Sequence, residues 1–216
     1  MKFRKFLAIV FIMLIFPAFN LYSQGNTAVP FLLISPDSKF GAMGDAGSAL
    51  SDNVSSIYWN PAGIAFLTGS EVSLTHSKWL PQFNLDLYYD YLAYRTYIED
   101  IDGSFTTSIT FMNYGEFVRT NDRGDVLGTF RSYDGALTLG YSTKIDQDWG
   151  LGFNFRIIRS QLSESPTAQE KGKGVSTSAS VDLGVIWRPQ ELVFDNLDLS
   201  QKVSVGLNLS NIGPKI

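Results

Sequence analysis

After residue 67, most of the chain alternates between apolar and small or polar side chains with a period of two. That pattern predicts β-strands with two different faces. It occurs in seven stretches, which are Val72–Trp79, Asn84–Tyr94, Ser104–Tyr114, Asp134–Lys144, Trp149–Ser160, Ser176–Arg188 and Lys202–Asn211. No apolar run here approaches the roughly 20 residues of a membrane-spanning helix. The sequence therefore predicts an all-β fold.

Alternation of this kind occurs both in soluble β-sandwiches and in transmembrane antiparallel β-barrels. Two observations favour the barrel. The second face is rich in Gly, Ser, Thr and Asn, and charged residues make up only 18% of the chain, below the roughly 25% of soluble domains. If the chain enters from the periplasm, four rings fall at one membrane side of the apolar face, where interfacial aromatics belong. These rings are Phe105, Tyr141, Trp149 and Trp187.

The alternation also assigns side chains to the two faces. In the second stretch, Tyr89 and Tyr91 share the apolar, lipid-facing side with Leu85, Leu87 and Ala93. The charged and amide side chains expected in the lumen are Asp86, Asp90, Asn154, Arg156 and Asp182. We expect the acids to be solvated or paired with Arg156.

The connections fit alternating strands. Ile145–Asp148 predicts a tight periplasmic turn, and Gly115–Tyr133 and Gln161–Val175 predict longer outward loops. Within the first loop, Asn121–Gly124 resembles the turn of a hairpin that extends the strands above the membrane. Two connections are longer than usual periplasmic turns, Arg95–Gly103 and Pro189–Gln201.

Seven strands do not close a bacterial barrel, which has an even number of strands. An open edge in lipid would leave backbone groups unpaired at several kcal/mol each. We therefore expect residues 68–216 to be about the first half of a barrel from a longer protein.

Residues 1–23 have a basic start, an apolar run from Phe6 to Phe16, and then Pro17 with small or polar residues. This layout predicts a cleaved secretory signal peptide. No Cys follows it, so it is not a lipoprotein signal. We expect the mature chain to be exported.

Residues 24–67 are small, glycine-rich and mixed, which predicts a compact plug inside the lumen with short helices. Ser35-Pro36-Asp37 indicates a helix N-cap followed by proline in the first turn, and Asn60-Pro61 indicates a second one. The glycines Gly41, Gly44 and Gly47 are expected to permit close packing.

The composition excludes several kinds of chemistry. The chain has no Cys and one His, so thiolate sites, multi-histidine metal sites and disulfides are excluded. We expect no cofactor and no metal. A net charge of −4 does not favour nucleic acid as a partner. His76 lacks a nucleophile on its own face, because Ser73 and Ser77 fall on the opposite one.

Several short motifs resemble the PorV/PorQ family, whose members are similar to the fatty-acid transporter FadL. They are Ala28–Ser38, Gly41–Asp45, Tyr58–Ala62, Tyr114–Phe117, Arg156–Arg159 and Gly206–Lys215. The resemblance implies a plugged FadL-like barrel of fourteen strands in the outer membrane, belonging to the type IX secretion system. It also implies that the protein binds cargo with a C-terminal signal domain at the translocon SprA and delivers it to the sortase PorU in the attachment complex.

The main hypothesis is therefore a non-enzymatic secretion subunit that contacts its partners through outward loops. The candidate contacts are Trp79, Phe117, Arg119 and Arg123. Two alternatives stay open: passive uptake of hydrophobic molecules, as in FadL, and an enzyme such as a lipid A deacylase. The polar lumen argues against the first, and the isolated His76 against the second.

Overall fold

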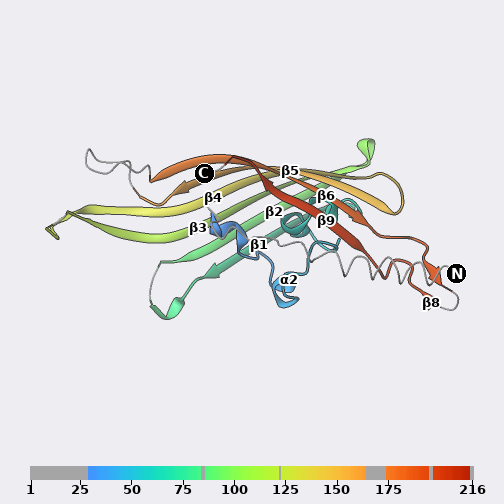
Figure 1. Ribbon diagram of the computed structural model, residues 1–216, viewed down its shortest axis with the longest axis horizontal. Helices are drawn as coiled ribbons and strands as arrows, with labels where there is room; N and C mark the ends of the chain where they lie inside the picture. Colours follow the sequence, from blue (N-terminus) through green and yellow to red (C-terminus); the bar gives the residue numbers. More distant parts are fainter. Residues whose placement is uncertain (1–28, 84–85, 122, 164–173, 195–196, 215–216) are drawn as a thin grey trace, which may run out of the picture.

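The computed structural model describes residues 29–83, 86–121, 123–163, 174–194 and 197–214. Its main element is an antiparallel sheet of seven strands in the order β1-β2-β3-β4-β5-β6-β9 (Figure 1). The strands are β1 (Ser70–Lys78), β2 (Tyr88–Ile98), β3 (Gly103–Thr120), β4 (Val126–Lys144), β5 (Trp149–Gln161), β6 (Val175–Trp187) and β9 (Val205–Ile212). Each corresponds to one predicted stretch, so the antiparallel all-β prediction is confirmed. The sheet is open, with β1 and β9 at its edges.

At one end of the sheet, which we call the turn end, short turns join β2 to β3 and β4 to β5. Ile145–Asp148 forms the expected turn, closed by a bond from the Ile145 amide to the Trp149 carbonyl. The connection predicted as Arg95–Gly103 is shorter than expected, because β2 continues to Ile98. Only η5 (Glu99–Ile101) and Asp102, in the left-handed conformation, link it to β3.

At the opposite end, which we call the hairpin end, β3 and β4 extend far beyond their neighbours. The two strands contain 18 and 19 residues and pair as far as Thr120 and Val126. The Asn121 side chain closes the turn by accepting bonds from the amides of Arg123 and Asp125, both 2.9 Å long. The predicted hairpin is therefore confirmed, and most of Gly115–Tyr133 is strand rather than loop.

The connection before β9 contains a two-stranded hairpin of its own, β7 (Val193–Phe194) and β8 (Leu197–Asp198). Asp148 attaches the start of this connection to the neighbouring turn, because its carboxylate and carbonyl accept bonds from the amides of Gln190 and Arg188.

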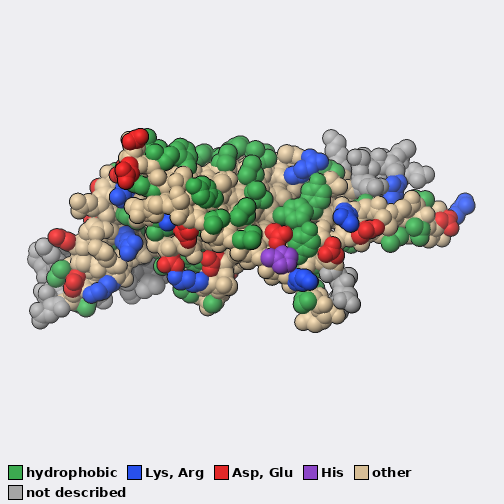
Figure 2. Space-filling view, turned by 180° about the vertical axis from the view of Figure 1, so that it is seen from behind, with side chains coloured by type: hydrophobic (Ala, Val, Ile, Leu, Met, Phe, Trp, Pro, Cys, Tyr) green, Lys and Arg blue, Asp and Glu red, His purple; other side chains and the backbone are tan. Residues whose placement is uncertain are grey.

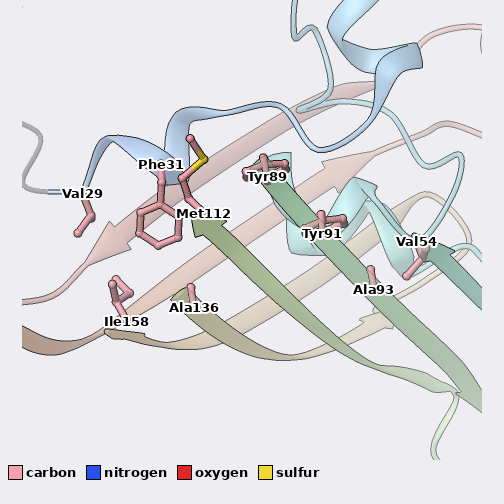
Figure 3. Packing of buried hydrophobic residues seen from close by; sticks show 9 residues of the cluster. All are labelled: Val29, Phe31, Val54, Tyr89, Tyr91, Ala93, Met112, Ala136 and Ile158. Atoms are coloured by element: carbon pink, nitrogen blue, oxygen red, sulfur yellow. The ribbon is translucent and has the colours of Figure 1, made fainter. Parts of the chain in front are cut away.

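Residues 29–67, which we call the plug, lie against one face of the sheet (Figure 1). The short helices of the plug are η2 (Pro30–Leu33), α2 (Ser38–Ala42), α3 (Ser56–Trp59) and η3 (Pro61–Ile64). Val29, Phe31 and Val54 from this segment pack with side chains of β2 to β5 into a buried cluster (Figure 3). The strand residues of the cluster are Tyr89, Tyr91, Ala93, Met112, Ala136 and Ile158.

The helix caps agree with the sequence in one case and differ in the other. Asn60 caps η3 by accepting the Ala62 amide at 2.9 Å, and Pro61 occupies the first position of that helix. In the other motif, Asp37 rather than Ser35 is the N-cap, and its carboxylate accepts the amides of Lys39 and Phe40. The helix starts two residues later than predicted because Asp37 adopts the extended conformation required of a cap.

The predicted signal peptide, residues 1–23, and residues 164–173 of the loop Gln161–Val175 lie outside the described residues. Within the described ranges, no helix has the length and apolar character needed to cross a membrane.

Candidate functional site

The face of the sheet opposite the plug, which we call the outer face, is covered by apolar side chains (Figure 2). Leu74 on β1 is 73% exposed and Ile109 on β3 is 50% exposed. Other exposed members of this apolar band are Val72, Leu92, Leu137, Leu139, Leu151, Phe155, Ile157, Leu183, Leu207 and Leu209. A sheet surface of this composition is typical of one that lipid or another protein covers.

A first aromatic row borders the band at the turn end. Phe105 and Tyr141 are paired across β3 and β4 with ring centroids 5.1 Å apart. Trp149 and Trp187 are paired across β5 and β6 with centroids 6.2 Å apart. The prediction that these four rings share one end of one face is confirmed.

A second aromatic row, not predicted from the sequence, borders the band at the hairpin end. Phe111 lies 6.1 Å from Tyr88 and 5.7 Å from Tyr133, measured between ring centroids. Beside this row, His76 Nδ1 and Asp90 Oδ1 lie 2.6 Å apart. Both side chains are about half exposed on the outer face.

The position of Asp90 corrects the predicted faces of β2. Tyr89, Tyr91 and Ala93 are buried against the plug, whereas Leu92 and Tyr94 are exposed on the outer face. The prediction was wrong because β2 carries aromatic rings on both faces. The positions of the rings therefore do not show which face lies against the plug and which is the outer face.

The distance between the two borders of the band can be read along β5. Arg159 lies ten positions after Trp149, about 33 Å at 3.3 Å per residue. A strand of this length tilted by about 40°, as in outer-membrane barrels, would cross about 25 Å, the usual height of their apolar band.

The inner face uses its polar side chains to bind the backbone of the plug. Ser142 Oγ donates to the Pro61 carbonyl at 2.6 Å, and Asn208 Nδ2 donates to the Trp59 carbonyl at 2.8 Å. Ser204 Oγ donates to the Ala49 carbonyl at 2.6 Å. The Ser- and Asn-rich face predicted from the sequence is therefore largely a set of donors for the carbonyls of the plug.

The Asn60 side chain, which is fully buried, forms hydrogen bonds with both the plug and the sheet. Its Nδ2 donates to the carbonyls of Ser48 at 2.7 Å and Val185 at 3.1 Å, and lies 3.4 Å from that of Leu207. One side chain thus binds the plug backbone, β6 and β9.

Two inner-face glycines let this motif lie directly on the sheet. A Cβ at Gly184 would be 2.0 Å from Asn60 Oδ1, and one at Gly152 would be 2.2 Å from the carbonyl carbon of Pro61. Of the plug glycines singled out in the sequence, Gly47 packs closely, against Trp59, whereas a Cβ at Gly44 would meet open space. The close approach depends mainly on strand glycines, for which the alternating pattern predicted only a place on the polar face.

Two ion pairs lie on the inner face. Alternation predicted that position for Arg156 and Asp182, and it left Arg95 and Glu71 unassigned. Arg156 Nη2 lies 2.9 Å from Asp182 Oδ2, so the buried arginine is paired with Asp182 and not with Asp86 or Asp90. Arg95 Nε lies 2.9 Å from Glu71 Oε2, and the same oxygen accepts the Val54 amide. The second pair binds the plug to β1 and β2.

A cavity of about 270 Å³ remains between the plug and the inner face. Its lining combines rings such as Tyr58 and Trp59 with polar groups such as Arg156, Thr138 and Asn208. Burial raises the pKa of Tyr58 to about 12, so the phenol stays protonated and donates to the Leu32 carbonyl at 2.9 Å.

Three of the four candidate partner contacts lie on the extended β3–β4 hairpin. Phe117 is 45% exposed and stacks on Phe130 with centroids 5.8 Å apart. Arg119 lies across from Gly128, and Arg123 is in the turn. Val118, Val126 and Leu127 are also exposed on this hairpin. Neither the plug cluster nor the apolar band includes them.

Trp79 lies apart from that hairpin. It follows β1 in the connection to β2, is 40% exposed, and its amide donates to the Leu87 carbonyl. The structure therefore places the four candidates on two connections at the hairpin end of the sheet.

The described residues contain no group of three or more His, Asp or Glu side chains suited to a metal ion. Ser73 and Ser77 are on the face opposite His76, as alternation predicts.

Comparison with known proteins gives one clear result. No curated protein sequence matches the chain. The family model described as type IX secretion system protein PorV matches residues 22–216, which include the plug and all seven strands of the sheet. The chain therefore belongs to the PorV family of type IX secretion system proteins.

Proposed function

We propose that this chain belongs to an outer-membrane subunit that binds secreted cargo with a C-terminal signal domain. In this proposal the subunit takes the cargo at the translocon SprA and delivers it to PorU in the attachment complex. Family membership supports a role in type IX secretion. The proposed role is that of a binding protein, without catalysis.

The outer face supports the membrane location. An apolar band of about 25 Å with an aromatic row at each border matches the lipid-facing surface of an outer-membrane barrel. In this proposal the turn end faces the periplasm and the hairpin end faces outward. The two open edges, β1 and β9, pair with further strands, so that a fourteen-stranded FadL-like barrel encloses the plug.

The observation that carries the binding role is the β3–β4 hairpin beyond the second aromatic row. It exposes Phe117, Val118 and Val126 where the proposed orientation offers neither lipid nor a protein core. Apolar side chains exposed together in water indicate a surface that a protein partner covers.

The experiment uses a deletion strain that is complemented with the full-length gene. The strain without the gene should retain signal-bearing cargo in the periplasm. Replacing Phe117 and Phe130 together by Ala should reduce cargo at the cell surface and cross-linking of the protein to the translocon. Thr129→Ala, on the same hairpin, should leave both unchanged. Normal surface display in the deletion strain would refute the proposal.

Uptake of hydrophobic molecules has less support. The inner face is bound to the plug by Asn60, Ser142, Asn208 and the Arg95–Glu71 pair, and the remaining cavity has polar groups in its lining. Growth on long-chain fatty acids with and without the gene separates the two functions, and we expect no difference.

A further inference from the structure

The β3–β4 hairpin projects beyond the strands on either side of it (Figure 1). The pairing of β2 with β3 ends at Asn113, and the pairing of β5 with β4 ends at Tyr133. β3 and β4 stay paired with each other as far as Thr120 and Val126. Within the described residues, each strand of this extension therefore has one side on which no other strand pairs with it.

The hydrogen bonds at the end of β5 show which residues of β4 direct their backbone groups to its free side. Successive residues of an antiparallel strand direct their amide and carbonyl groups alternately to one neighbour and to the other. The Leu162 amide donates to the carbonyl of Gly174, which directly precedes β6. Gln161, one residue earlier, is therefore directed to β4, and its partner Tyr133 is directed to β5.

The same alternation continues along β4 beyond its last partner on β5. Arg131 and Thr129 lie two and four residues before Tyr133, so their amides and carbonyls are directed to the same side. Val118 lies directly opposite Thr129 on β3. Because directly opposite residues either bond each other or both point away, the Val118 backbone is directed to the free side of β3.

The edge of β4 is the more regular of the two. β3 has an irregularity between Asn113 and Gly115, at the point where its free part begins, whereas β4 is regular from Gly128 to Tyr133. The free edge of β4 is therefore a direct continuation of the edge that β5 occupies. Proteins commonly protect an exposed strand edge with Pro or Lys, and residues 126–132 contain neither.

We propose that the free edge of β4, centred on Thr129, binds an extended segment of the secreted cargo as an additional β-strand. The backbone groups of Thr129 and Arg131 form hydrogen bonds with the segment. Every second side chain of the segment is apolar and packs on the stacked rings of Phe117 and Phe130. Recognition through the backbone suits cargoes of different sequence. This inference rests on the proposed function and specifies how the hairpin binds.

Hydrogen exchange at single-residue resolution tests the edge directly. The full-length protein in lipid nanodiscs is measured with and without a purified C-terminal signal domain of a secreted cargo. Without the domain, the Thr129 amide should exchange as fast as an amide that has no partner. With the domain, its exchange should slow at least tenfold, whereas the Val118 amide on the other edge should stay fast.

Proline variants test the same amide in a binding titration with that domain. Thr129→Pro removes an amide that β3 does not use, and it should weaken binding about tenfold, which corresponds to about 1.4 kcal/mol. Val118→Pro makes the same change directly opposite, on the other edge, and should bind normally. Thr129→Ala keeps the amide and should also bind normally, which assigns the loss to the backbone.

Three results would overturn the inference: fast exchange at Thr129 in the complex, slow exchange there before the domain is added, or equal binding by Thr129→Pro and Val118→Pro. The double replacement of Phe117 and Phe130 by Ala separates the two proposals. If it weakens binding while the Thr129 amide stays unprotected in the wild-type complex, only the added strand is refuted. A wild-type protein that does not bind the domain refutes both proposals.

Discussion

Asn60 connects three parts of the molecule through one amide group. It caps η3, donates to the plug at Ser48, and donates to β6 at Val185. Its Cβ-less neighbour Gly184 makes room for the amide oxygen. A hydrogen-bonded amide in a buried position is costly to remove, because its former partners stay buried without new ones.

Asn60→Ala should therefore destabilise the folded protein by about 2–4 kcal/mol, since several hydrogen bonds are lost at about 1 kcal/mol each and carbonyls are left unsatisfied. Urea titration of the full-length protein in lipid vesicles measures the change. Asn53→Ala serves as the control, because the hydrogen bonds of its side chain join it to the plug residues Asp37 and Ser55, and its cost should be about 1 kcal/mol.

Gly152→Ala tests the close contact between the plug and the sheet. The added methyl would overlap the backbone of Pro61, so we expect a loss of about 1–3 kcal/mol in the same titration. In Gly135→Ala the nearest atom to the added methyl is 3.8 Å away, so that variant should be neutral or slightly more stable. Equal effects of the two variants would contradict the contact.

The strands show how far the sequence predicts the elements. Alternation located all seven strands of the sheet, because a strand between two unlike environments must repeat with a period of two. It assigned β5 correctly, with Phe153 outward and Asn154 inward. It failed for β2, because Tyr89 and Tyr91 fill space beside the plug. Alternation predicts that the two faces of a strand differ, whereas packing against the plug determines which of the two faces is buried.

The candidate site was less predictable than the strands. Phe117 was identified from its place in an expected hairpin, but its stacking on Phe130 depends on the pairing register. That register includes an irregularity between Asn113 and Gly115, where Gly115 has a φ of 86°. Such a shift exchanges the faces of the residues beyond it, and alternation within either strand does not reveal it.

The edge strand β1 depends on the Arg95–Glu71 pair for its attachment to the plug. Arg95 also donates to the carbonyls of Thr68 and Gly69. Arg95→Met should therefore cost about 1.5–3 kcal/mol and make the connection before β1 more sensitive to protease. The exposed pair between Lys39 and Asp52 provides the control, since Lys39→Met should cost less than about 1 kcal/mol.

For the whole molecule, the central question is what covers the outer face. Lipid explains three features together: the apolar band, the aromatic rows at both borders, and the polar His76–Asp90 pair and Arg159 at the hairpin end. A soluble sheet would bury this face against another layer of protein. The two explanations predict different free-energy costs for a charged side chain placed at different heights along the outer face.

Leu139→Arg and Thr177→Arg measure that dependence. Leu139 lies near the middle of the band, where an arginine should cost about 2–4 kcal/mol in a bilayer. Thr177 is paired with Arg159 at the border, where the cost should be about 0–1 kcal/mol. The free energy of folding into vesicles gives both values. Equal costs at the two heights would refute lipid coverage.

In the proposed orientation, the length of the β3–β4 hairpin sets where a partner can meet this protein. β3 continues for nine residues after Phe111, about 30 Å of extended chain. The proposal therefore places its tip clear of the head-group layer, at a height set by two hydrogen-bonded strands instead of a flexible tether. A partner bound there would be held at a fixed offset from the bilayer, and shortening the hairpin by pairs of residues would lower that offset in steps without changing the proposed membrane-embedded wall.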